Sequence, residues 1–239
     1  GLSEVKFQTT QIDTMAVFDN GNQVVVNTND CPFDIAKNTA TIIKSMYHEI
    51  DVLLLGYVAA SSWPHSYTLP EAEKEDAAEK KQNAKLQTAK KYIELLQPKY
   101  YIPFAGRYTL CGKNTVLNQY RGEPELEDAF EWLQNNIEQK NHRGVILNNN
   151  CWLDIDTGST NKNYVPINKN EKEIYVNEIL SKKKFPYETE PMPTASEILD
   201  LIPESYRNFE KIRQKIGWNS DTTIVLKTSD GDLIIAISC

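Results

Sequence analysis

Histidine and cysteine are scarce in this chain of 239 residues, which has three of the first and four of the second. The cysteines stand far apart and form no CxxC pair, which argues against a disulfide framework and a structural zinc site. A GxSxG nucleophile elbow and a glycine-rich phosphate loop are also missing, so neither a serine hydrolase nor a phosphate-binding loop is supported. We expect a protein of the reducing cytoplasm.

Long apolar runs and an excess of positive charge are missing as well. The longest apolar run, residues 52–60, is far shorter than the roughly 18 to 20 residues that a membrane span needs, and the first residues do not form a signal peptide. Acidic residues outnumber basic ones by 33 to 26, so neither a membrane nor nucleic acid is an expected partner. The 40% hydrophobic and 25% charged composition is that of an ordinary globular protein.

The first two thirds of the chain alternate between strand and helix patterns. Period-2 alternation and continuous apolar runs predict strands, whereas apolar residues at helical spacing predict amphipathic helices, the first of which Asp34 can cap. This alternation predicts an α/β protein with a right-handed, largely parallel sheet. The strands are expected at 5–11, 14–19, 23–28, 51–58 and 99–106, and the helices at 33–50, 68–97 and 125–139.

The composition changes beyond a hairpin predicted at 144–156, where a polar loop begins. Helices are expected near 171–182 and at 196–216, the latter interrupted by Pro203, and then a hairpin that turns at Asp230 and Gly231. We therefore predict two domains, an α/β domain over residues 1–165 and a small α+β domain over residues 166–239.

Three polar residues follow the predicted central strands. Asp30, His65 and Arg107 each come after the carboxyl end of a strand, and in open parallel sheets ligands bind at this edge. Simpler interpretations stand beside this one. Asp30 can be a turn or cap residue fixed by Pro32, His65 a surface or hydrogen-bonding histidine, and Arg107 the partner of a surface acid.

Several segments together resemble the second half of the metallo-β-lactamase fold. The likeness is to the branch of the CMP-N-acetylneuraminate hydroxylases and their bacterial relatives, in which a long Lys/Glu-rich helix also leads into a "QP…PFAG" strand. The resemblance covers roughly residues 5–160 and rests on "NTNDC", "DVLLLGY", "SSWPHSY", "LQPKYYIPFAG" and "GVILNNNCWLDIDTG". It implies one half or more of an αββα sandwich, followed by the small α+β appendage.

The resemblance implies that Asp30 is a metal ligand, because the strand-end aspartate of this superfamily bridges two metals. The histidine expected after a later strand is replaced by Ala105, and the chain contains neither the HxHxDH motif nor a Rieske signature. A catalytic zinc or iron site needs about three protein ligands, so such a metal is expected only in a longer protein. Gly1 in place of Met, and Cys239 directly after a strand pattern, favour a piece of a longer chain.

Two functional hypotheses follow. In the first, the chain is a fragment of a metal-dependent hydrolase or oxygenase, inactive alone. Its catalytic site would contain His65, either behind a metal ligand or facing an anionic small-molecule substrate, and Arg107, which would bind that substrate. The exposed sheet face of such a half would be covered by a second copy or by the missing N-terminal half. In the second, the chain is a non-catalytic binding or scaffold module that has lost its metal site. A flavodoxin-like or Rossmann-like binder is a third alternative, against which the missing glycine fingerprint counts.

Overall fold

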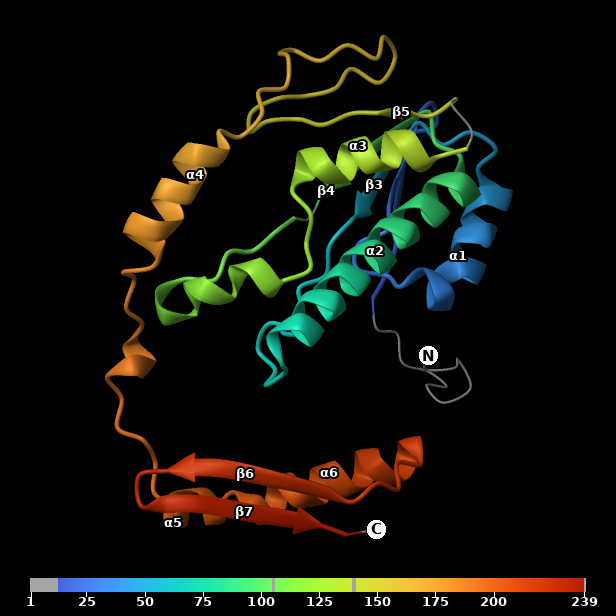
Figure 1. Ribbon diagram of the computed structural model, residues 1–239. Helices are drawn as coiled ribbons and strands as arrows, with labels where there is room; N and C mark the ends of the chain where they lie inside the picture. The colour runs from blue at the N-terminus through green and yellow to red at the C-terminus, as the bar shows by residue number, and fades with distance from the viewer. Residues whose placement is uncertain (1–12, 105, 139–140, 239) are drawn as a thin grey trace. The chain divides into compact units, whose positions relative to one another are not determined.

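The computed structural model describes residues 13–104, 106–138 and 141–238 (Figure 1). The chain forms two compact units, and the boundary between them lies between Lys183 and Lys184. The predicted domain boundary at residue 165 lies in the irregular stretch that precedes the helix α4 (Lys169–Tyr175). The strand predicted over residues 5–11 falls outside the described residues.

The first unit is built on a five-stranded mixed sheet with the strand order β1-β2-β3-β4-β5. The first two strands form an antiparallel hairpin, and each later strand runs parallel to its neighbour. The mixed α/β class predicted from the sequence is therefore confirmed. The strands are β1 (Ala16–Asp19), β2 (Val24–Asn27), β3 (Val52–Gly56), β4 (Tyr100–Phe104) and the short β5 (Arg143–Gly144).

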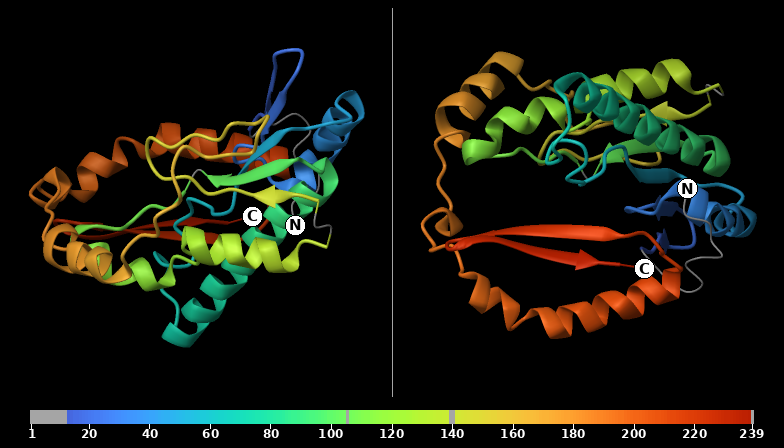
Figure 2. Two further views of the ribbon diagram at one scale, coloured as in Figure 1. Left: turned by 90° about the horizontal axis from the view of Figure 1, so that it is seen from above. Right: turned by 60° about the horizontal axis from the view of Figure 1, so that its bottom comes forward.

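Three helices cover one face of this sheet: α1 (Phe33–Met46), α2 (Glu71–Leu96) and α3 (Leu126–Asn136) (Figures 1 and 2). Alternate strand residues point into this layer and form the main core with apolar residues of the helices. The stripe predicted along α2 is confirmed, because all four of its residues are at most 2% exposed: Leu86, Ala89, Ile93 and Leu96.

The second face of the sheet is also apolar, and the chain itself covers part of it. Val52, Tyr100 and Val145 are buried there. The segment that follows β5 lies against this face, with Leu147, Leu153 and Ile155 contributing side chains, so strand residues on this face are only partly exposed.

Two local predictions are wrong. Asp34 does not cap α1, because Pro32 occupies the N-cap position without a side-chain cap, and the Asp34 carboxylate instead lies 3.6 Å from the Lys91 ammonium. The predicted hairpin over residues 144–156 is not formed. Only a single bridge joins Leu153 to Thr160, because the Asn148 side chain bonds the backbone N–H and carbonyl of Val165 and diverts the chain.

The connection from β4 to α3 contains a 3₁₀ helix that the sequence analysis did not predict, η2 (Gly112–Tyr120). The Asn118 side chain holds its entry by bonding both the N–H and the carbonyl of Leu110. After α3 and β5, the first unit ends with α4 and a π-helical turn, η3 (Val176–Leu180). No helix in the described part of the chain combines the length and the apolar character needed to cross a membrane.

The second unit joins helices to a two-stranded antiparallel sheet. The break predicted at Pro203 lies just before it, and Pro203 occupies the first turn of α6, where the missing N–H costs nothing. The Asp230 carboxylate accepts hydrogen bonds from the Ala195 N–H and the Thr228 hydroxyl, so it ties α5 to the hairpin turn. The elements are η4 (Pro186–Glu188), α5 (Ala195–Leu199), α6 (Ile202–Ile216), β6 (Thr222–Thr228) and β7 (Gly231–Ile237).

Candidate functional site

The three residues singled out in the sequence follow three neighbouring parallel strands. Asp30 comes after β2, His65 after β3 and Arg107 after β4. Because parallel strands end at the same edge of a sheet, these connections begin at one edge. The side chains nevertheless have separate surroundings, since the residues that line the cavity at Asp30 include neither His65 nor Arg107. The structure therefore does not bring the three side chains into one site.

A cavity of about 200 Å³ opens at the carboxyl ends of β2 and β3. One side is formed by the turn after β2, a second by the segment after β3, and a third by the middle of α2. We call it the edge cavity. Its lining residues are Thr28, Asn29, Asp30, Cys31, Gly56, Val58, Ala59, Ala60, Lys85, Thr88 and Tyr92.

A tight turn presents Asp30 to the edge cavity. Asn29 adopts a left-handed conformation with φ of 49°, its N–H donates to the Asn27 side chain, and the Cys31 N–H donates to the Thr28 carbonyl. Asp30 is exposed, and no hydrogen bond or ion pair joins its carboxylate to another described residue. The turn expected from the sequence is present, and it leaves the carboxylate available.

The floor of the cavity is fixed from below by α2. The Tyr92 hydroxyl donates a 3.0 Å hydrogen bond to the Cys31 carbonyl. Burial raises the pKa of the Cys31 thiol, and the charges of Asp13 and Asp30 raise it further. The thiol is therefore protonated at neutral pH, and it acts as a small apolar group rather than a metal-binding thiolate.

Lys85 lines the same cavity as Asp30. The Lys85 side chain is half-buried, and within the described residues its ammonium has no hydrogen bond or ion pair. Thr88, on the same side of α2, adds a hydroxyl. The edge cavity thus contains one carboxylate and one ammonium that are not paired with each other.

These residues do not fit a metal ion. Asp30 is the only carboxylate among the described residues that line the cavity, and Lys85 adds a positive charge to the same lining. Nowhere in the described ranges do three or more His, Cys, Asp or Glu side chains group as a metal site requires.

His65 lies in a cluster of buried polar side chains that is separate from the edge cavity. It is only 4% exposed, its ring lies 6.0 Å from that of Tyr108, and its Nδ1 has no hydrogen-bond partner. Burial lowers the pKa of His65, and the positive charges of Lys81, Arg121 and Lys74 lower it further. The imidazole is therefore neutral at pH 7.

In this cluster of polar side chains, Lys81 connects α2 to two loops. Its ammonium donates to the Ser61 carbonyl at 3.3 Å and to the Arg121 carbonyl at 2.7 Å. It also lies 3.8 Å from the Glu123 carboxylate. The side chain is 8% exposed, so Lys81 serves as a buried link between the loops that follow β3 and β4.

A glycine allows the loop after η2 to approach α2 closely. Gly122 has a φ of +65°, and a Cβ at this position would lie 2.5 Å from the Ala78 carbonyl oxygen of α2. Only glycine fits, and the loop can therefore bury Arg121 and Glu123 on either side of it. Burial raises the pKa of Glu123 even though Lys81, Arg121 and Arg107 lower it.

Arg107 forms an ion pair with Glu125, which also accepts 2.7 Å hydrogen bonds from Lys172. Burial alone would raise the pKa of Glu125, but the hydrogen bonds from Arg107 and Lys172 outweigh it and lower the pKa. The guanidinium is thus engaged by an acid, which is the simpler of the two roles considered for Arg107.

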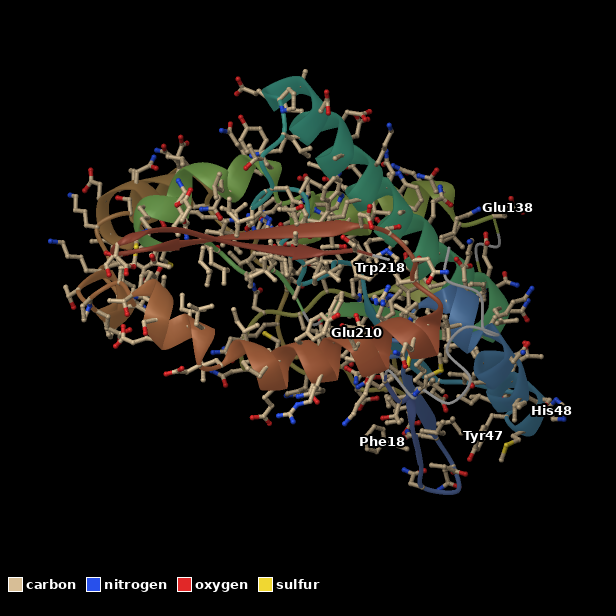
Figure 3. All side chains as sticks on the ribbon, turned by 90° about the horizontal axis from the view of Figure 1, so that it is seen from below. Phe18, Tyr47, His48, Glu138, Glu210 and Trp218 are labelled. Carbon is tan, nitrogen blue, oxygen red and sulfur yellow. The ribbon has the colours of Figure 1, made fainter. Side chains whose placement is uncertain are left out.

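A second hollow, of about 420 Å³, lies at the opposite edge of the sheet, where β3 and β4 begin. His48, at the end of α1 (Figure 3), and His142 line it. The two lysines among its described lining residues are already engaged: the Lys44 ammonium donates to the His48 carbonyl and the Lys99 ammonium to the Ile155 carbonyl. The edge cavity, with its unpaired Lys85, is therefore the better candidate site.

The sequence analysis missed the two lysines on α2, although a signal for them exists. Lys85 and Lys81 continue the buried stripe of α2 toward its N-terminus, about one and two turns before Ala89, respectively. A lysine in line with a buried stripe must either reach solvent or meet a polar partner. This pattern marks the place where α2 leaves the apolar core and reaches the polar edge of the sheet.

Comparisons with known proteins add no identification. No protein-family model matches the sequence, and neither the curated proteins nor the solved structures contain a match.

Proposed function

We propose that the first unit is a non-catalytic binding module for a small anionic molecule held in the edge cavity. The main support for this proposal is Lys85. The Lys85 ammonium has no hydrogen bond or ion pair among the described residues, and a bound anion would supply a charged partner. The neighbouring cations are already engaged, because Lys81 bonds two carbonyls and Arg107 pairs with Glu125.

The volume of the edge cavity indicates a small ligand. An apolar cavity of about 150 Å³ holds a benzene-sized molecule. The edge cavity has about 200 Å³, so we expect a ligand of roughly six to ten heavy atoms. Carboxylates and phosphates of this size suit the Lys85 ammonium and the Thr88 hydroxyl.

Titration calorimetry with propionate and with inorganic phosphate tests this proposal. At least one of them should bind the wild-type chain, and Lys85→Gln should weaken that binding about tenfold, the equivalent of about 1.4 kcal/mol. Lys80→Gln is the matched control, because Lys80 lies on the same helix but its side chain is 74% exposed and pairs with Asp76. Equal affinities of the wild type and Lys85→Gln would contradict the proposal.

We also propose that the first unit has the architecture of the second half of a metallo-β-lactamase-like sandwich. Its support is a run of parallel strands covered by helices on one face only, together with an apolar second face on which Val25, Leu54 and Ile102 are only partly buried. A second sheet packed on that face would complete such a sandwich.

A fragment of a metal-dependent hydrolase or oxygenase is the second candidate. Asp30 favours it, because its carboxylate follows a sheet strand and is free of partners among the described residues. Further ligands would have to come from elsewhere, since no second carboxylate lines the cavity within the described part of the chain. Zinc titration of the wild type and of Asp30→Asn separates the candidates. Tight binding that requires Asp30 would favour the metal protein over the binding module.

A further inference from the structure

We infer that the ligand of the edge cavity is a zwitterion, a short amino acid whose carboxylate binds Lys85 and whose ammonium binds Asp30. This inference rests on the proposed function and specifies a second charged group of the ligand, its ammonium. Its basis is that one cavity contains both an unpaired cation and an unpaired anion.

The acids around the cavity weaken the binding of a ligand whose only charge is negative. Asp30 lines the cavity, and Asp13 is close enough that both acids raise the pKa of the Cys31 thiol. Asp13 is engaged, because its carboxylate accepts hydrogen bonds from the Asn29 side chain and the Thr14 N–H. An anion drawn to Lys85 would meet the uncompensated charge of Asp30. A ligand with its own ammonium turns this repulsion into a second attraction.

The remaining walls suit a short aliphatic chain between the two charged ends. Val58, Ala59 and Ala60 line the cavity, and Gly56 adds no side chain. The cavity volume of about 200 Å³ leaves no room for a ligand that has a large aromatic side chain in addition to both charged groups. Lys85 and Asp30 form no ion pair within 4.0 Å of each other, so a ligand that bridges them must separate its charges by at least one carbon atom.

Three pairs of ligands that differ by a single ammonium group test the inference. They are glycine and acetate, β-alanine and propionate, and γ-aminobutyrate and butyrate. In at least one pair the amino compound should bind the wild-type chain about fivefold more tightly or better, as measured by calorimetry at neutral pH. The pair with the largest ratio reports the distance between Asp30 and Lys85.

Variants of Asp30 and a control show whether Asp30 causes the preference for the amino compound. Asp30→Asn removes the anion and should reduce the ratio within each pair to about one. Asp34→Asn is the charge-matched control, because Asp34 is 89% exposed, pairs with Lys91 and does not line the cavity, and it should leave the ratio unchanged. Asp30→Ser provides a second variant of the exposed turn position.

The outcomes separate this inference from the proposed function. Equal binding of the two members of every pair, or a preference that survives both Asp30 variants, would overturn the zwitterion and leave the anion module standing. Absence of binding by every carboxylate, every amino acid and inorganic phosphate would overturn both. Loss of the amino preference in both Asp30 variants, with carboxylate binding retained, is the result that we expect.

Discussion

At the scale of single residues, Lys81 is the buried link between the connections that follow β3 and β4. Its ammonium bonds two loop carbonyls and is the nearest cation to Glu123. Lys81→Met should destabilise the fold by about 3 kcal/mol, because it leaves the Glu123 carboxylate buried without that cation. Urea unfolding measures the change. Lys80→Met, at an exposed neighbouring position, should change the stability by less than about 0.5 kcal/mol, and similar losses in both variants would contradict the role of Lys81.

His65 gives the stability a pH dependence of known sign. Burial and the nearby cations hold its folded-state pKa below the ordinary value of 6.5. As the pH falls below 6.5, the unfolded chain therefore binds a proton that the folded chain does not, and the stability decreases. Urea unfolding at a series of pH values should show a smaller acid loss in His65→Gln than in the wild type. His48→Gln, at an exposed position, should behave as the wild type does. An identical acid loss in His65→Gln would show that the imidazole is not held neutral.

Individual site residues were only partly predictable. The positions of Asp30, His65 and Arg107 after strand ends were predictable, because strand ends can be read from hydrophobic patterns, but only Asp30 lines the edge cavity. Their partners could not be read in this way. Arg107 meets Glu125 and Lys172 through contacts between segments that are distant in sequence, and such contacts depend on the three-dimensional packing of the loops.

At the scale of elements, the approach of the η2–α3 connection to α2 depends on one glycine. Gly122→Ala should destabilise the protein by at least about 3 kcal/mol, because the new Cβ adds a clash to an unfavourable positive φ. Gly21→Ala is the matched control: its φ is also positive, at +87°, but no atom lies within 4 Å of its Cβ position. The control should cost about 1 kcal/mol in urea unfolding. Equal costs would mean that the loop is not pressed against Ala78.

In the second unit, the Asp230 carboxylate joins the start of α5 to the hairpin turn. Asp230→Ala should speed amide exchange at Ala195 and in the β6–β7 turn several-fold, because both lose an acceptor that fixes them. Hydrogen exchange followed by NMR measures this. Asp232→Ala, on an exposed position of β7, is the control, and exchange rates that rise equally in both variants would contradict the link.

The elements themselves were largely predictable, because strong periodicity and apolar runs depend on local sequence. The β1–β2 hairpin, α1, α2, α3 and the β6–β7 hairpin agree with the sequence analysis in type and place. The failures lie where side-chain to backbone bonds decide the path. The bonds of Asn148 to Val165 replace the expected hairpin after β5, and those of Asn118 hold the unexpected η2.

At the scale of the whole molecule, the buried apolar residues are concentrated in the first unit. All the buried clusters of the described residues lie between positions 26 and 145, whereas Ile224, Val225 and Ile234 of the hairpin are each more than a third exposed. The first unit therefore has the rigid framework that a preformed binding cavity requires. This distribution supports placing the ligand site in the first unit.

Mapping the binding site by amide NMR tests the central claim most directly. During titration with β-alanine, the account predicts shifts confined to amides around the edge cavity, at Asn29, Cys31, Ala60 and Thr88. In Lys85→Gln the shifts should need about tenfold more ligand to reach the same size, whereas Lys80→Gln should titrate as the wild type does. Shifts centred instead on the hollow at the opposite edge of the sheet, around residues 48–51 and 97–99, would contradict the account.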